Sequence, residues 1–300
     1  MAVLVTGSTG TVGSEVVRQL VALGEEVFAL TRDVDKTSFP EGVIPVNGSL
    51  SQPLVLRDVL KKVRGLFLMS PVVSDELTGT LTALSLASAE GVKDVVYLSA
   101  LEAHKFTDIP HFAAKASAER MIRDKGISAT ILQPGYFMQN DGSEKKQIFD
   151  LGVYFPPIGN RETGSGVLAV DVRDLGEIAA KELIRRMNSD GRLPNRTLAV
   201  AAPGSFTGED AAEIWSSAIN RKVKYNGDDL DSFELYLRRF LSDDLAFDIR
   251  IMMYNFRVYG MKMPEGSSSL LHDLLGRPMK TYREYVEEVS LIWSKEIGFD

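Results

Sequence analysis

The chain has 300 residues, 44% of them hydrophobic and 25% charged, which is the composition of an ordinary globular protein. It contains no cysteine, which excludes disulfide bonds, thiolate catalysis and cysteine-ligated metals, and its three histidines show no metal-binding spacing, so we expect no metal site. The net charge of −7 argues against a nucleic-acid-binding surface, because phosphate binding needs clustered positive charge.

Short apolar runs alternate with amphipathic segments through the first half of the chain. Such runs are typical of strands buried on both faces of a parallel sheet, and they occur at 3–5, 27–30, 43–46, 66–69, 95–98 and 129–132. Helices are predicted between them at 12–23, 53–63, 76–90 and 112–125. This alternation predicts an α/β fold with a doubly wound, mostly parallel sheet of the Rossmann type.

The pattern changes after Gln133. Residues 134–166 are rich in glycine and proline and are predicted to form loops with one short helix, followed by a helix at 171–187. A strand is predicted at 197–201, where it would return to the sheet, and further helices at 207–220, 230–241, 243–260 and 281–296. We therefore expect a sheet domain over 1–187, with 134–166 contributing loops to its cleft, and a smaller, mainly helical substrate lobe over 188–300.

Three glycines with the spacing GxxGxxG directly follow the first predicted strand and open the first predicted helix. Glycine permits the tight turn and the close approach of a pyrophosphate, and the helix N-terminus points unpaired N–H groups at the anion. The segment therefore predicts a dinucleotide-binding loop, although a purely structural turn remains the alternative. Its predicted contacts are Gly7, Ser8, Thr9, Gly10, Thr11, Val12 and Gly13.

The residues after the second predicted strand bear on the choice of cofactor. An acid there would bind the ribose 2′-hydroxyl of NAD, whereas a basic residue would bind the 2′-phosphate of NADP. Arg32 comes first after the strand, so we predict NADP. Asp33 follows directly and keeps NAD open, and Arg32 could also be an ordinary exposed arginine.

Six segments of the sequence match motifs of a known family: GSTGTVG at 7–13, LTR at 30–32, GLFLMSP at 65–71, VVYLS at 95–99, LQPGYFMQN at 132–140 and GRPMKTY at 276–282. Together they resemble the NmrA-like family of atypical short-chain dehydrogenases, and the resemblance covers most of residues 1–187. It implies an NAD(P)-binding Rossmann domain. The implied cofactor contacts, beyond the glycine loop, are Ser49, Leu50, Met69, Ser70, Pro71, Ser99, Lys115, Pro134, Gly135 and Phe137. Ser49 departs from the family, which usually has an acid there.

The Tyr-x-x-x-Lys motif that short-chain dehydrogenases use for acid–base catalysis is absent, since no tyrosine has a lysine four residues later. His111 and Lys115 share one face of the helix after the fifth strand, and the resemblance implies that Lys115 binds the nicotinamide ribose. Ser99 and Tyr136 complete the candidate catalytic set. The alternatives are an ion pair of Lys115 with Glu119, a helix-start role for His111 and a core position for Tyr136.

Two functions are compatible with these features. The first is an NAD(P)H-dependent reductase of a small conjugated or carbonyl substrate, such as a quinone or a dye, because acceptors that delocalise charge need little acid catalysis. The second is a catalytically silent NAD(P)-sensing protein that acts through a protein partner. We expect a cytoplasmic protein without signal peptide or membrane span, and a homodimer remains open.

Overall fold

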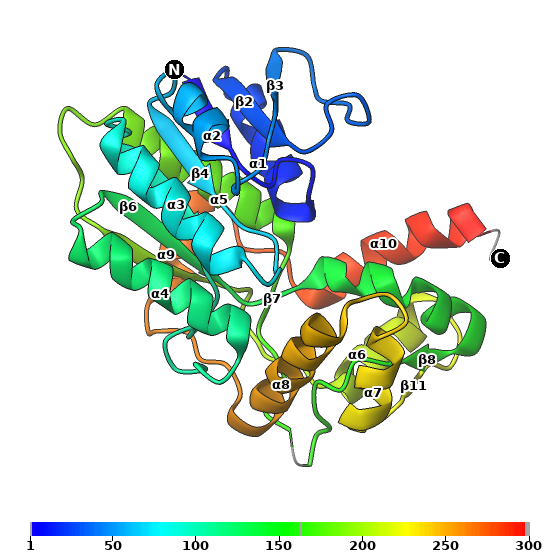
Figure 1. The fold of residues 1–300 in the computed structure, drawn as a ribbon. Coiled ribbons are helices and arrows are strands. Elements are labelled where there is room, and N and C mark those ends of the chain that lie inside the picture. The colour runs from blue at the N-terminus through cyan, green and yellow to red at the C-terminus, as the bar shows by residue number, and fades with distance from the viewer. Residues whose placement is uncertain (1, 163, 298–300) are drawn as a thin grey trace. The chain divides into compact units, whose positions relative to one another are not determined.

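The computed structural model describes residues 2–162 and 164–297, which form two compact units (Figure 1). Unit 1 contains residues 2–133, 172–199 and 273–276, and unit 2 contains the remaining described residues. This division differs from the expected one, because 134–171 belongs to unit 2 and 188–199 belongs to unit 1. The reason is pairing: strands within 134–171 join one another, and 188–199 leads into an edge strand of the unit 1 sheet.

Unit 1 is built on a seven-stranded sheet, as the alternation of apolar runs predicts. Its strands are β1 (Ala2–Val5), β2 (Glu26–Thr31), β3 (Val43–Asn47), β4 (Gly65–Leu68), β5 (Asp94–Leu98), β6 (Ala129–Pro134) and β10 (Arg196–Val200). They lie in the order β10-β6-β5-β4-β1-β2-β3, and the neighbours from β3 to β6 are parallel. The doubly wound Rossmann-type sheet is therefore confirmed.

Helices cover both faces of this sheet (Figure 1). They are α1 (Thr11–Ala22), α2 (Pro53–Leu60), α3 (Glu76–Ala89), α4 (Pro110–Asp124) and α5 (Val172–Met187). Helices α2, α3 and α4 share one buried apolar cluster with the strands, which includes Leu4, Leu66 and Val95. Helix α5 covers the opposite face, where it packs against α1 and where Leu183 and Met187 contact the glycine that begins β4.

The strand order reverses at β1. Strand β2 lies on one side of β1 and β4 lies on the other, so the chain crosses in opposite directions from this point. In open parallel sheets a ligand binds at such a switch point, outside the carboxyl ends of the strands. The carboxyl ends of β1 to β4 are therefore the place to look for a site in unit 1.

Unit 2 combines short strand pairs with helices. Strand β7 (Tyr136–Phe137) pairs with β9 (Ala169–Val170), and β8 (Val153–Tyr154) pairs with β11 (Lys224–Tyr225). The 134–166 segment also holds two short helical stretches at Met138–Glu144 and Gln147–Leu151. The longer helices are α6 (Gly208–Ala218), α7 (Leu230–Leu237), α8 (Asp243–Tyr259) and α10 (Tyr282–Ile297), while α9 (Ser267–Leu275) runs on into unit 1.

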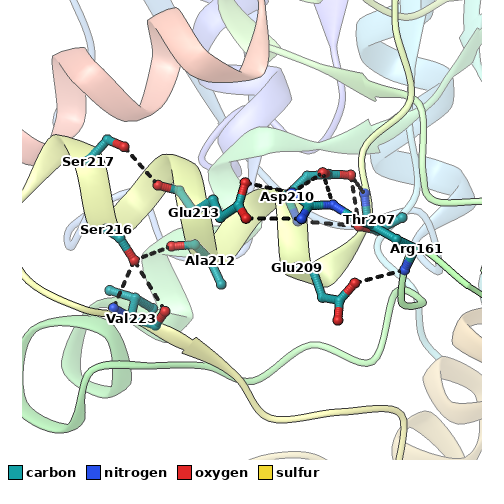
Figure 2. Close-up of polar contacts among 9 residues, drawn as sticks. All are labelled: Arg161, Thr207, Glu209, Asp210, Ala212, Glu213, Ser216, Ser217 and Val223. Atoms are coloured by element: carbon teal, nitrogen blue, oxygen red, sulfur yellow. Dashed lines mark hydrogen bonds and ion pairs between the residues drawn. The ribbon is translucent and has the colours of Figure 1, made fainter.

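The start of α6 shows how a loop of unit 2 is held in place. Thr207 caps the helix as predicted, and it exchanges hydrogen bonds with Asp210 in a capping box. Figure 2 shows Arg161 lying across this first turn, with ion pairs to Asp210 at 2.7 Å and to Glu213 at 2.6 Å. The Arg161 backbone N–H donates to Glu209 at 2.9 Å. These contacts fasten the loop at Arg161 to α6.

Candidate functional site

A cavity of about 380 Å³ lies at the carboxyl ends of β1 to β4. Its walls come from the loops after these strands and from the first turn of α3. The lining residues are Gly7, Thr9, Gly10, Leu30, Thr31, Arg32, Gly48, Ser49, Leu50, Ser51, Met69, Ser70, Pro71, Val73, Asp75, Glu76 and Gly79. Predicted cofactor contacts after four different strands are thereby brought together at the topological switch point.

The turn after β1 can be made only with glycine at two positions. Gly7 has a φ of +62°, a conformation that side chains rarely adopt, and a Cβ there would lie 2.7 Å from Met69 Cγ. A Cβ on Gly13 would lie 2.0 Å from the Gly7 carbonyl oxygen. The first glycine therefore makes the turn, and the third lets α1 begin directly against it.

The N-terminus of α1 is open for an anion. Gly10 occupies the N-cap position, so no side chain accepts the first N–H groups of the helix, and the first turn contains no acid. Thr9, Gly10 and Thr11 are exposed. An uncapped helix N-terminus behind a glycine turn carries partial positive charge and aligned N–H donors, which is the arrangement that binds a diphosphate.

The other predicted contacts of this loop lie outside the cavity lining. Ser8 is buried, and its hydroxyl donates to the Leu30 carbonyl oxygen at 2.7 Å, which ties the loop to the end of β2. Val12 is buried in the core of unit 1. Thr11 and Gly13 belong to the first turn of α1 and also do not line the cavity.

Arg32 and Asp33, which follow β2, differ in whether their charged groups have partners within the protein. Arg32 is exposed, lines the cavity and has no ion pair with any described residue. The Asp33 carboxylate is engaged within its own loop, where it pairs with Lys36 at 2.8 Å and accepts the backbone N–H groups of Asp35 and Lys36. The Lys36 hydrogen bond is the main reason that the pKa of Asp33 is lowered. The guanidinium is thus free for a phosphate, whereas the carboxylate is occupied.

Thr6 joins the two loops that flank the switch point. Its hydroxyl donates to the Met69 carbonyl oxygen at 2.7 Å and accepts the Met69 N–H at 2.8 Å. Ser70, the next residue, is buried and shares a hydrogen bond with Thr80 of α3. These contacts hold the loop after β4 beside the glycine turn, so that Met69, Ser70 and Pro71 form one wall of the cavity.

Lys115 pairs with a different carboxylate from the one considered in the sequence. It extends from α4 to α3, where its Nζ donates to Glu76 Oε1 at 2.8 Å, and the exposed fractions of the two side chains are only 10% and 4%. The alternative considered for Lys115, a surface ion pair with Glu119, is therefore wrong. Glu119 is itself buried, and it accepts the hydroxyl of Ser99 at 2.5 Å and the amide of Gln133 at 2.8 Å.

The remaining candidates fall in other places. His111 is half-buried in the first turn of α4, with its ring centroid 4.7 Å from that of Phe112. Pro134 ends β6, and Tyr136 and Phe137 form β7 in unit 2. Burial raises the pKa of the Tyr136 hydroxyl, with further contributions from the charges of Asp141 and Glu144.

Gly135 has a packing role in unit 2. A Cβ there would lie 2.3 Å from the Leu168 carbonyl oxygen, so the residue permits the close approach of β7 and β9. Glu76 is the main residue of the cavity that the sequence analysis did not single out. Its available signal was an acid in the first turn of the helix that follows a central strand, at the sheet edge where ligands bind.

The doubly wound sheet, the glycine turn and the open helix end at the switch point define a Rossmann-like dinucleotide-binding fold. The model of the NmrA-like family matches residues 1–257, and the chain belongs to this family. The resemblance stated from the sequence is thereby confirmed, and the match extends beyond the residues that first carried it.

Several known proteins are similar to the chain over nearly its whole length. The NAD(P)H azoreductase of Xenophilus azovorans is 26% identical over 291 residues, which cover 95% of this chain and 96% of that protein. An NADPH-dependent quinone oxidoreductase from Escherichia coli superposes with a TM-score of 0.79 at 22% identity, covering 96% of this chain and 99% of the other. Triphenylmethane reductase of Citrobacter sp., solved with NADP(H), gives 0.78 and 21% with the same coverage.

Within the described residues, no group of three or more histidine and acidic side chains is placed to hold a metal ion. None of the helices in residues 2–162 and 164–297 combines the length and hydropathy that a membrane span requires.

Proposed function

We propose that the protein is an NADPH-dependent reductase of small, conjugated acceptors of the quinone or dye type. The observation that carries the proposal is the cavity at the switch point, with its glycine turn, open helix end and unpaired arginine. The substrate class is supported by the relatives, since an azoreductase, a quinone oxidoreductase and a triphenylmethane reductase all resemble this chain along its length.

In this proposal the chain's own residues bind and orient the cofactor. The N–H groups at the start of α1 bind the diphosphate, and the guanidinium of Arg32 binds the 2′-phosphate. The neighbouring Asp33 is paired with Lys36 and is not the proposed ribose ligand. Lys115 and Glu76 lie on the β4 side of β1, where the second ribose would extend. When bound, NADPH supplies the hydride.

The proposed acceptors need little from side chains as proton donors. Quinone and dye acceptors delocalise the incoming electron pair, so positioning and the exclusion of water account for most of the rate. This fits a chain in which Tyr-x-x-x-Lys is missing and in which the Ser99 hydroxyl is already engaged as the donor of a hydrogen bond to Glu119. The proposal retains the expected cytoplasmic location, where reduced cofactor is available.

The test is to follow NADPH oxidation with a panel of quinones, azo dyes and triphenylmethane dyes. The proposal expects turnover with at least one class, and a loss of about 10-fold or more in kcat/KM for Lys115→Met, because a charge-assisted hydrogen bond is lost. Lys125→Met, which removes an exposed lysine at the end of the same helix and outside the cavity lining, is the control and should change kcat/KM little. NADPH binding without oxidation of any acceptor would contradict the reductase and favour the sensing function.

A further inference from the structure

Helix α8 of unit 2 leaves a row of apolar side chains on its outer face. Phe247, Tyr254 and Val258 are 48%, 42% and 44% exposed, and Ile251 between them is half-buried. These residues follow one another at intervals of four, three and four, so they share one face of the helix. The opposite face is buried in unit 2, where Phe256 is only 2% exposed. The row is therefore apolar surface that remains after α8 has packed.

The spacing of this apolar row is the one by which helices pair. Apolar residues that alternate at intervals of three and four form the seam of a coiled coil, where they insert between the side chains of a second helix. Exposed fractions of almost one half leave about 300 Å² of apolar surface on the row, a patch size that is often functional on a monomer. The row therefore fits a second helix as its partner.

The two ends of the row carry opposite charges. Asp243 and Asp244 begin α8, and Asp231 of the adjacent helix α7 has a side chain that is 87% exposed. Arg257 lies in the last turn of α8, and Lys262 follows the helix. Two copies of α8 that pair antiparallel bring the acidic end of each to the basic end of the other, whereas a parallel pair brings like charges together. The partner that complements α8 is thus an antiparallel second copy.

The flank of α8 that holds Arg250 is compatible with this pairing. In the antiparallel pair Arg250 would lie near Arg257 of the second copy, which alone would be repulsive. Arg250, however, pairs with Asp231 at 2.6 Å and with Glu234 at 3.0 Å. The ion-pair network on this flank has more acids than bases, with the members Asp231, Glu234, Asp243, Arg238 and Arg250. Its net negative charge favours the arginine of a second copy.

We infer that the apolar row of α8 is the interface of a homodimer, in which two copies of the helix pack antiparallel about a two-fold axis. Phe247 of each copy then faces Val258 of the other, and Ile251 faces Tyr254. Together with the charged flanks, such a contact reaches about 1,200 Å² in total, the lower end of specific interfaces, so we expect a dissociation constant of about 1–10 µM. The inference is independent of the bound cofactor.

Analytical ultracentrifugation of wild type from about 1 to 100 µM tests whether the dimer forms, and two variants test its location. Tyr254→Glu places a charge of each copy in the middle of the seam, so it should weaken the dimer by about 10-fold or more. Tyr254 is partly exposed and Arg257 lies one turn away, so the monomer should tolerate the new acid, which thermal unfolding checks. Leu291→Glu, at a 66% exposed position of α10, is the control and should dimerise as wild type does.

Disulfide cross-linking tests the orientation, because the chain has no cysteine of its own. In the antiparallel pair the two copies of residue 247 lie about 16 Å apart along the helix axis, too far for a disulfide, whereas residue 247 of one copy faces residue 258 of the other. Phe247→Cys and Val258→Cys should therefore each stay uncross-linked alone, and their mixture should oxidise to a covalent dimer.

The contrary results each overturn a stated part of the inference. A wild type that stays monomeric at about 100 µM would overturn the dimer, and a raised acceptor KM in Tyr254→Glu would then assign the apolar row to substrate binding. A dimer that Tyr254→Glu leaves intact would place the interface on another surface. Cross-linking of Phe247→Cys with itself would contradict the antiparallel arrangement.

Discussion

Two buried glutamates of unit 1 differ in how completely the protein satisfies them. Glu182 of α5 is fully buried, and both of its oxygens accept hydrogen bonds, from Thr130 at 2.8 Å and from Arg185 and Arg196. Glu76 of α3, which lines the cavity, is almost equally buried but has a partner for only one of its two carboxylate oxygens. The comparison teaches that burial alone does not distinguish the two acids, which differ in whether the protein supplies a partner to each carboxylate oxygen.

The surroundings of Glu182 explain its structural role. Arg186, one turn along α5, is also buried, and it donates to Thr130 and to the carbonyl oxygens of Leu193 and Pro194. Burial lowers the pKa of Arg186 to about 10, with the charge of Arg185 adding to the effect. The cluster thus joins α5, β6 and the segment that leads into β10, and every contact serves the fold.

The largest expected effect comes from making the same substitution at both glutamates. In Glu182→Gln the amide N–H₂ must face arginine N–H donors, so the substitution should lower the unfolding free energy by about 2–4 kcal/mol. This is below the top of the range for a broken buried ion pair, because Arg185 and Arg196 are partly exposed. Glu76→Gln can keep an oxygen on Lys115 and loses one ion pair where Glu182→Gln loses two, so its cost should be smaller, about 1–2 kcal/mol.

Chemical denaturation of the two variants measures this difference, and NADPH titration should rank them in the reverse order. Glu182→Gln should keep the wild-type affinity, whereas Glu76→Gln should not. Equal losses of stability at the two positions would remove the basis of the comparison.

Gly13→Ala tests the turn that brings the ligand to Glu76. Because the new Cβ would lie 2.0 Å from the Gly7 carbonyl oxygen, the turn or the helix must move, and we expect NADPH affinity to fall by about 100-fold, the effect of losing several phosphate hydrogen bonds. Gly24→Ala is a useful reference for stability, since a Cβ there meets nothing, although its φ of +81° adds strain. Retained NADPH affinity in Gly13→Ala would show that the turn does not hold the diphosphate.

Arg32→Ser tests the other end of the proposed ligand, away from Glu76. The variant should lose about 10-fold in NADPH affinity and little in NADH affinity, because only NADPH has the 2′-phosphate that the guanidinium would bind. Parallel titrations with both cofactors give the ratio. An unchanged ratio would mean that Arg32 is an ordinary surface residue and would return Asp33 to consideration.

A third buried acid, Glu144 in unit 2, extends the comparison. Its Oε2 also has no hydrogen-bond partner, but this carboxyl group can be neutralised by binding a proton. Burial raises the pKa of Glu144 to about 7, and the charge of Asp141 adds to the shift. The folded form therefore binds this proton more tightly than the unfolded chain does. Its contribution to stability is present at low pH and is lost as the pH rises through about 7.

Thermal unfolding between about pH 5 and pH 8 should show Glu144→Gln losing less stability with rising pH than wild type, by a few degrees in Tm, since 1 kcal/mol shifts Tm by about 2–4 °C at this size. Glu287→Gln, at an exposed position of α10, is the matched control and should follow wild type. A Glu144→Gln profile that coincides with wild type would mean that Glu144 is already ionised in the fold.

The sequence predicts the parts of this structure that local patterns determine. Apolar runs give the central strands, the GxxGxxG spacing gives the turn at Gly7, and Thr207 gives the start of α6. Helix α9 is missed because Ser267, Ser268 and Ser269 resemble a loop, and its stability comes from tertiary packing.

The partner of Lys115 could not be predicted, because local spacing favours Glu119 one turn away whereas the actual partner lies 39 residues earlier in the chain. In the same way, nothing in the glycine motif shows that Ser8 turns towards β2 and not towards a ligand. Side-chain partners that depend on the crossing of separate elements require the folded structure, and the pairing at Glu76 is of this kind.

Hydrogen–deuterium exchange with and without saturating NADPH tests the central claim most directly, because it reports both binding and its location. Bound NADPH should slow exchange of the backbone amides in the glycine turn and the first turn of α1, and of those in the loop after β4 up to Glu76, while α6 exchanges as before. Unchanged exchange in both loops at millimolar NADPH, or protection confined to unit 2, would contradict a cofactor site at this switch point.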